Sequence, residues 1–265
     1  MMNLKKGAKG DRVIALQELL RKQGFDPGAV DGDFGNGTEA AVMAFQKSEG
    51  LLADGIVGAK TLSALGMSVT EQDQRPDGAA KFTVAVVSEM FPSTPIGNIK
   101  KNLPFILAGL KKFGLGDRDM ILMALATIRA ETEGFVPIDE FKSRYNTPPS
   151  GAPFSLYDNR KDLGNKGPTD GADFKGRGFI QLTGRANYTN IGAQIGRNLV
   201  ENPDLANEPE VAAEILAMFL KNVERRVREA LLTNDLKSAR RAVNGGTHGL
   251  DRFESAFKTG RKLTA

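Results

Sequence analysis

The segment "DRDMILMALATIRAE", residues 117–131, is apolar at almost every position between its charged ends. Asp117 is a candidate N-cap, because a short acidic side chain accepts a hydrogen bond from the first turn of a helix. A helix that is apolar on nearly every side is buried in its domain. The segment therefore predicts a buried central helix within a mainly α-helical fold.

Glu131 ends this helix and continues one of its apolar faces. Ile128 and Ala124 precede it by three and seven residues, and Thr127 lies one turn earlier, so these side chains share one side of the helix. Glu133 is rotated by about 200° from Glu131. Of the two glutamates, the spacing thus selects Glu131 as the one that points to the interior.

A carboxyl group that is partly removed from water has a raised pKa and can keep the proton that a general acid delivers. Glu131 is therefore a candidate general acid. A buried ion pair with Arg177 or Arg185 would explain the same apolar setting, and both interpretations remain open at this point.

Residues 132–173 follow as a long segment rich in Gly, Pro, Asn and Asp. A loop of this length in a compact domain is usually functional or disordered, and Tyr145, Phe154 and Tyr157 favour order. Aromatic faces suit sugar rings, so Tyr145 is a candidate substrate contact. Glu140 supplies a second carboxylate, and two carboxyls flanking a cleft are the minimum for glycoside hydrolysis.

The stretch "FKGRGFIQLTGRANYTNIG", residues 174–192, contains "FIQLT", which alternates like a short strand. Gln181 and Thr183 would face one side of it. With Asn187 and Tyr188 they place four neutral hydrogen-bonding side chains within eight residues, which suits an uncharged, hydroxyl-rich substrate. A polar face on an edge strand is the alternative interpretation.

The N-terminal part contains an internal repeat, "VDGDFGNGTEAA" at 30–41 and "ADGIVGAKTLSA" at 53–64. Each copy predicts an Asp-Gly turn followed by a helix. Ahead of them, residues 10–25 form an amphipathic helix that Asp11 would cap and Gly24 would end. We expect a three-helix domain at residues 1–66, a polar linker at 67–80 and a larger, mostly helical domain at 81–265.

Composition excludes several classes of protein. The chain has no Cys and one His, which excludes disulfides and disfavours a zinc site. We therefore expect no metal or cofactor. Residues 81–265 hold 27 Lys and Arg against 21 Asp and Glu, a net charge of +6. No basic run with interleaved aromatic residues indicates nucleic acid, and no stretch reaches the length of a membrane span or of a secretory signal.

Residues 3–66 resemble the three-helix peptidoglycan-binding domain, through "LKKGAKGDRVIALQELLRKQGF", "DGDFGNGTEAAVMAFQ" and "DGIVGAKTLSAL". Residues 81–265 resemble glycoside hydrolase family 19, the chitinase and endolysin group with a lysozyme-like fold, through "ATIRAETEGF", "GRGFIQLTGRANY", "NPDLA" and "RRAVNGG". The resemblance implies a helical wall-binding domain joined to a lysozyme-like catalytic domain that inverts the anomeric carbon.

The family resemblance also implies roles for individual residues. Glu131 is the implied general acid. Gln181, Thr183 and Asn187 are implied to line the cleft, with Thr183 helping to hold the attacking water, and Asn244 is implied to contact sugar. Glu140 is the implied second carboxylate, on a loop shorter than that of the plant chitinases. Its rivals are Asp139, Glu133 and Asp158.

We expect a phage-type endolysin that is made in the cytoplasm, acts as a monomer on peptidoglycan after release, and neither binds nucleic acid nor inserts into membranes. A lytic transglycosylase, a chitinase and a non-catalytic wall-binding protein are the alternatives. The sequence does not distinguish the two glycosidic linkages of peptidoglycan.

Overall fold

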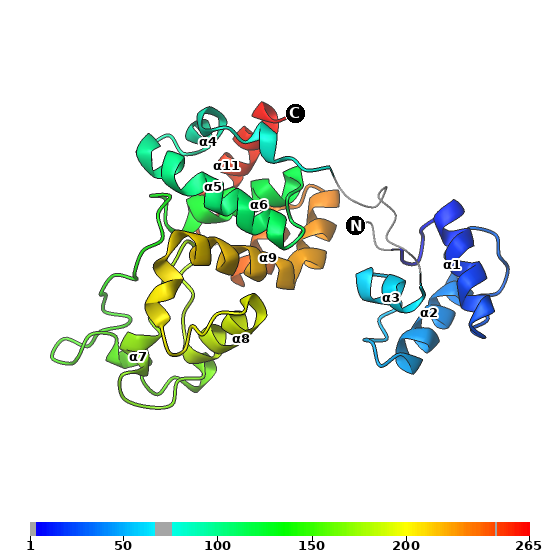
Figure 1. Cartoon of the computed structure of the whole chain (residues 1–265), viewed down its shortest axis with the longest axis horizontal. Helices are drawn as coiled ribbons and strands as arrows, with labels where there is room; N and C mark the ends of the chain where they lie inside the picture. Colours follow the sequence, from blue (N-terminus) through cyan, green and yellow to red (C-terminus); the bar gives the residue numbers. More distant parts are fainter. Residues whose placement is uncertain (1–3, 67–75, 247) are drawn as a thin grey trace. The chain divides into compact units, whose positions relative to one another are not determined.

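The computed structural model describes residues 4–66, 76–246 and 248–265 of the chain. They divide into two compact units, Met1–Arg75 and Pro76–Ala265, and each unit has its own hydrophobic core. Both units are built from helices (Figure 1). The prediction of a mainly α-helical fold is confirmed.

Among its described residues, the first unit contains three α-helices: α1 (Asp11–Lys22), α2 (Asn36–Ser48) and α3 (Ala59–Ala64). Its core includes Val13, Leu16 and Leu20 from the predicted apolar face of α1. The N-cap position of α1 is occupied by Gly10, at φ 105°, and not by Asp11. The chain enters the helix through a backbone conformation that glycine adopts without strain.

The repeat in this unit is explained by a buried glutamine that the sequence analysis did not single out. The Gln17 amide donates to Asp31 Oδ1 at 3.1 Å and to Thr38 Oγ1 at 3.0 Å. Its carbonyl oxygen accepts from the Gly32 N–H at 3.0 Å. One side chain thus fixes the Asp-Gly turn against the start of α2.

Gln46 does the same for the second copy of the repeat. Its amide donates to Asp54 Oδ1 at 3.1 Å and to Thr61 Oγ1 at 3.2 Å, and its carbonyl accepts from the Gly55 N–H at 2.9 Å. Buried polar groups need such partners. The repeated Asp, Gly and Thr residues therefore have a structural task at the two turns.

The second unit contains eight further α-helices among its described residues: α4 (Val84–Met90), α5 (Ile96–Lys112), α6 (Arg118–Glu131), α7 (Asp170–Asp173), α8 (Arg185–Ile195), α9 (Pro209–Leu232), α10 (Leu236–Asn244) and α11 (Leu250–Leu263). Helix α6 is the predicted central helix, and each residue from Met120 to Ile128 is buried. It packs against α5, α9 and α11 (Figure 1).

Asp117 caps α6 as predicted, since its carboxylate accepts from the Met120 N–H. The same carboxylate also forms a two-point ion pair with Arg228 of α9, at 2.7 and 3.0 Å. Both side chains are largely buried, at 8% and 10% exposure. This pair joins the start of the central helix to its neighbour.

The predicted linker spans residues 67–80. Its residues 67–75 lie outside the described part of the chain. Residues from 76 onward belong to the second unit, where the Gly78 N–H donates to the Gly116 carbonyl at 2.8 Å. Nearby, the Lys81 ammonium donates to the Thr264 carbonyl at 3.0 Å. The beginning and the end of the second unit are therefore in direct contact.

Within the ranges that the structure describes, no helix has both the length and the apolar character needed to cross a bilayer.

Candidate active site

A cleft of about 170 Å³ in the second unit gathers most of the predicted site residues. It lies where the end of α6 meets the turn before α8 and the end of α10. Five of the residues predicted from the sequence line it: Glu131, Gln181, Thr183, Asn187 and Asn244. Thr127, Leu163, Ile180, Leu182, Phe219 and Val243 complete its wall. A single carboxylate thus sits among neutral amides, hydroxyls and apolar groups.

Glu131 is held by an arginine from another helix. Its Oε1 lies 2.6 Å from Arg240 Nη2, and the two side chains are 19% and 0% exposed. Arg240 also donates to the His248 carbonyl at 3.0 Å. The guanidinium fixes one carboxylate oxygen and thereby sets the direction in which Glu131 faces the cleft.

The ion-pair interpretation of Glu131 named the wrong partners. Arg177 instead pairs with Asp204 at 2.8 Å, and Arg185 pairs with Asp170 at 2.5 Å. Arg240 was not among the residues predicted from the sequence, although its spacing carries a signal. Arg240 and Asn244 are four residues apart on α10, so one face of that helix carries both to the site.

The predicted strand "FIQLT" is a turn. Arg177 and Leu182 form an isolated antiparallel bridge, and between them Gly178 and Gln181 adopt positive φ angles of 83° and 56°. Extended backbone does not have these angles. The expected alternation is lost as well, because Ile180, Gln181, Leu182 and Thr183 all line the cleft.

Hydrogen bonds fix the polar side chains of this turn. Gln181 donates its amide to the Ile138 carbonyl at 3.0 Å, and the Thr183 hydroxyl donates to the Gln181 carbonyl at 2.8 Å. Asn187 donates to the Thr183 carbonyl at 2.8 Å. Since the Thr183 proton is used in this way, its oxygen offers lone pairs that accept a hydrogen bond from water.

Glu140 is hydrogen-bonded to the chain just before this turn and is not among the residues of the cleft lining. Its backbone N–H donates to the Gly176 carbonyl at 2.7 Å, and its Oε2 accepts from the Gly176 N–H at 3.1 Å. A methyl group at Gly176 would lie 2.9 Å from Gln181 Oε1 and 3.2 Å from Glu140 Oε2. Glu140, the predicted second carboxylate, and Gln181 of the cleft wall therefore both lie close to Gly176.

Gly176→Ala is expected to lower turnover strongly while the helices stay folded. The added methyl would lie 2.9 Å from Gln181 Oε1, which forces that side chain to move, and 3.2 Å from Glu140 Oε2, which must give by a few tenths of an ångström. Turnover on soluble glycan fragments and the melting temperature should be measured on the same samples. Wild-type turnover in this variant would show that Glu140 and Gln181 need not keep this arrangement.

Two predicted substrate contacts lie elsewhere. Tyr188 is completely buried. Its hydroxyl donates to the Lys175 carbonyl at 2.8 Å and accepts from Arg177 at 3.1 Å. It packs against Phe174 in the core and cannot touch a substrate, so this prediction was wrong. Tyr145 is 71% exposed on the Glu140 loop, outside the cleft lining.

The rivals of Glu140 have other partners. Burial would raise the pKa of Asp139, but hydrogen bonds from Lys175 and Asn207 outweigh it and leave the pKa lowered. Asp158 accepts from the Gly171 N–H at 2.9 Å. Both carboxylates are thus used in fixing the loop.

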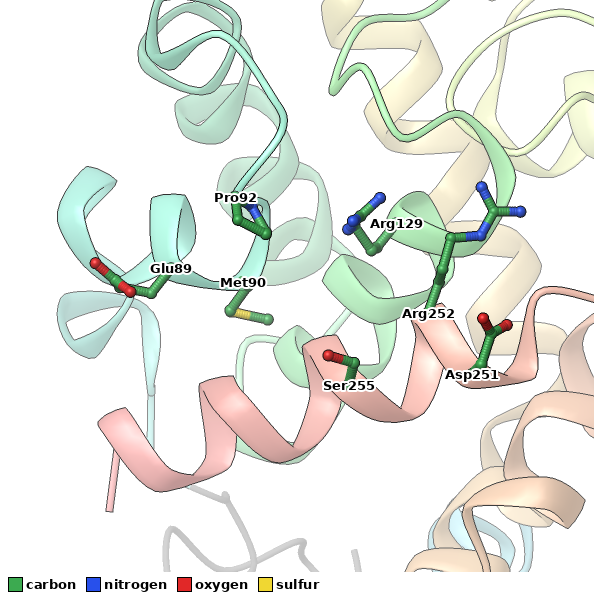
Figure 2. Close-up of a pocket in the computed structure, with 7 residues that line it drawn as sticks. All are labelled: Glu89, Met90, Pro92, Arg129, Asp251, Arg252 and Ser255. Carbon is green, nitrogen blue, oxygen red and sulfur yellow. The ribbon is translucent and has the colours of Figure 1, made fainter.

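Glu133 is not among the residues that line the cleft with Glu131. It pairs with Arg129 and, at 3.1 Å, with Arg252. The hydrogen bond from Arg129 lowers the pKa of Glu133. Figure 2 shows Arg129 of α6 and Arg252 of α11, which line a pocket of about 240 Å³ together with Met90 and Ser255.

Thr127 is a further cleft residue whose role was not predicted. It lies one turn before Glu131 and is 1% exposed. Its hydroxyl has no hydrogen-bond partner among the described residues, although buried hydroxyls normally have one. In the same ranges, no cluster of three or more His, Asp or Glu side chains has a metal-binding arrangement.

Comparison with known proteins connects both units to families. Residues 9–65 match the peptidoglycan binding domain family, and residues 157–227 match the family described as chitinase class I. A spore cortex-lytic enzyme of Bacillus cereus is 45% identical over 71 residues, which are 27% of this chain and 27% of that protein. A glycosyl hydrolase family 19 domain-containing protein of Haemophilus influenzae is 29% identical over 108 residues, covering 41% of this chain and 51% of that protein.

The crystal structure of an endolysin from Burkholderia AP3 phage is also similar, at 20% identity and a TM-score of 0.27. The match covers 98% of this chain and 99% of that one. The chain spans from about a quarter to about half of the length of the two curated relatives.

Proposed function

We propose that this chain, which joins a peptidoglycan-binding domain to a glycoside hydrolase family 19 domain, is a cell-wall lytic enzyme that hydrolyses the glycan strands of bacterial peptidoglycan. The observation that carries the proposal is the cleft itself. Glu131 is the carboxylate in its lining, and Gln181, Thr183, Asn187 and Asn244 surround it with neutral hydrogen-bonding groups. Such a lining suits sugar hydroxyls.

In the proposed reaction, Glu131 is the general acid. Arg240 binds its Oε1, so the proton that moves to the leaving glycosidic oxygen is carried on Oε2. Protonation lets that oxygen depart as a hydroxyl group, which lowers the barrier to cleavage of its bond to the anomeric carbon.

Glu140 is the proposed base on the other side of the sugar. It takes a proton from a water molecule as the water oxygen bonds to the anomeric carbon, and the configuration there is inverted. The Thr183 oxygen accepts a hydrogen bond from this water, since its own proton is donated to the Gln181 carbonyl. One water is consumed and one new reducing end is formed for each bond that is cut.

Mass spectrometry of the products from purified peptidoglycan tests this function. A new reducing end that contains one added water is expected for a hydrolase. A product lighter by one water, with an anhydro-sugar end, would show a lytic transglycosylase instead. Release from chitin but not from peptidoglycan would identify a chitinase, and no release from either polymer would leave only wall binding.

We further propose that the first unit anchors the enzyme to the wall. Its separate core and its match to the peptidoglycan binding domain family support this role. The proposed substrate is immobile and multivalent, so a second binding site raises the effective concentration of the cleft near its bonds.

Deleting residues 1–75 is expected to weaken sedimentation of the protein with intact cell walls while leaving turnover on soluble glycan fragments nearly unchanged. The reason is that each described residue in the cleft lining belongs to the second unit. Pull-down with walls and turnover in solution should be compared with the full chain. Equal loss of wall binding and turnover would contradict the assignment of wall binding to the first unit and of cleavage to the second.

A phage origin, a cytoplasmic site of synthesis and a monomeric state stay predictions. Fractionation of producing cells before and after lysis, together with sedimentation of the purified protein, would test them.

A further inference from the structure

The Glu140 carboxylate receives hydrogen bonds from three separate parts of the chain. Asn146 Nδ2 and the Tyr157 hydroxyl both donate to Oε1, at 2.9 and 2.8 Å. The Gly176 N–H donates to Oε2 at 3.1 Å. Oε1 therefore has two donors and Oε2 has one, although an ionised carboxylate oxygen can accept two.

The two donors to Oε1 are themselves well fixed. The Asn146 side chain is completely buried and also donates to the Phe141 carbonyl at 2.9 Å, while its oxygen accepts from the Ser143 N–H at 2.8 Å. Tyr157 ends a short 3₁₀ helix, Ser155–Tyr157. Its carbonyl accepts from Asn165 at 2.8 Å.

The Tyr157 hydroxyl also keeps the proton with which it forms its hydrogen bond to Glu140. Burial, followed by the hydrogen bond to Glu140, raises the pKa of Tyr157 to about 12. The phenol therefore stays protonated at neutral and mildly alkaline pH and keeps its hydrogen bond to the carboxylate.

The less occupied oxygen is the one near the cleft wall. The point where a methyl group would sit on Gly176 is 3.2 Å from Glu140 Oε2 and 2.9 Å from the side-chain oxygen of Gln181, and Gln181 lines the cleft. Without Tyr157 and Asn146, the carboxylate could rotate about its last bond, because that torsion is broad and roughly two-fold.

We propose that Tyr157, assisted by Asn146, is a positioning residue for Glu140: it occupies Oε1 so that Oε2 takes the proton from the attacking water. This inference rests on the proposed function, because it presumes that Glu140 is the base. Tyr157 does not touch the substrate in this arrangement and acts only through the orientation of the carboxylate.

Tyr157→Phe removes only the hydroxyl and keeps the ring in place. We expect kcat on soluble glycan fragments to fall by about 10- to 100-fold, the range expected for a lost hydrogen bond to a charged group. KM and the melting temperature should stay near those of the wild type. In a Glu140→Gln background the same substitution should have little further effect on kcat, because a coupled pair is non-additive.

Tyr188→Phe is the matched control. Tyr188 also donates a buried hydroxyl hydrogen bond, at 2.8 Å, but to the Lys175 carbonyl. Its loss should lower the melting temperature without lowering kcat per folded molecule.

Three results would overturn the positioning role. They are wild-type kcat in Tyr157→Phe, a rise in KM alone, and an equal loss of kcat in both backgrounds. If Glu140→Gln is impaired while Tyr157→Phe is not, only the positioning role fails and the proposed function stands. Full kcat in Glu140→Gln would overturn the base assignment together with its positioning.

Discussion

Replacing Glu131 with glutamine is expected to lower kcat by about 10²–10⁴-fold, the usual contribution of a general acid. Glutamine fills the same volume and still accepts the hydrogen bond from Arg240, but it has no proton to give. The leaving oxygen must then depart as an anion. Turnover should be measured on soluble glycan fragments, so that the proposed wall binding by the first unit does not enter the result.

The ion pair with Arg240 makes a stability measurement necessary. Removing one partner of a buried pair costs about 3–5 kcal/mol when the other charge is left without an acceptor. Since glutamine keeps an acceptor and Glu131 is 19% exposed, we expect a smaller decrease in the melting temperature. Normal turnover per folded molecule, with a large decrease in melting temperature, would make Glu131 a structural residue.

Glu133→Gln is the matched control for this variant. Glu133 is 42% exposed and pairs with Arg252 away from the cleft, so kcat should change little. A loss of kcat as large as that of Glu131→Gln would contradict the assignment of the acid.

Replacing Glu140 with glutamine is the second variant with a large expected effect. We expect kcat to fall by about 10²–10⁴-fold, because the attacking water loses the group that accepts its proton. Glutamine keeps an oxygen that can accept from Tyr157, but its amide nitrogen would face either another donor or the water. Turnover and melting temperature should again come from the same samples.

Asp139→Asn serves as the neighbouring control. Asp139 is paired with Lys175 at 2.9 Å, so its loss should affect the loop more than the chemistry and leave most of kcat. If Asp139→Asn is the more severe variant, the base is one residue earlier in the chain. If neither variant is impaired, the reaction does not depend on a carboxylate at this place.

Local pattern was sufficient for the features that depend on one helix. The apolar run of α6, its Asp117 cap and the inward position of Glu131 follow from helical spacing, and the structure confirms them. The resemblance to the hydrolase family added Gln181, Thr183, Asn187 and Asn244, which reach Glu131 from other parts of the chain. The structure brings all four to the same cleft.

The errors arise where tertiary contacts override local pattern. "FIQLT" alternates like a strand, but Gln181 adopts a left-handed conformation that its hydrogen bond to the Ile138 carbonyl holds. Tyr188 was judged by its hydroxyl, whereas its ring is packed against Phe174. Arg240 is 109 positions from Glu131, a separation at which local spacing gives no information.

The contact between Lys81 and Thr264 affects how chains of this kind can gain or exchange domains. A folded unit whose entry and exit points lie together can be joined to a new partner by a short connection, and the join disturbs none of its interior. Recombination between genes can therefore exchange the attached module and leave the catalytic cleft intact. Under the proposed function, such an exchange would give the hydrolase a different wall anchor, and with it a different range of target cells, in a single genetic event.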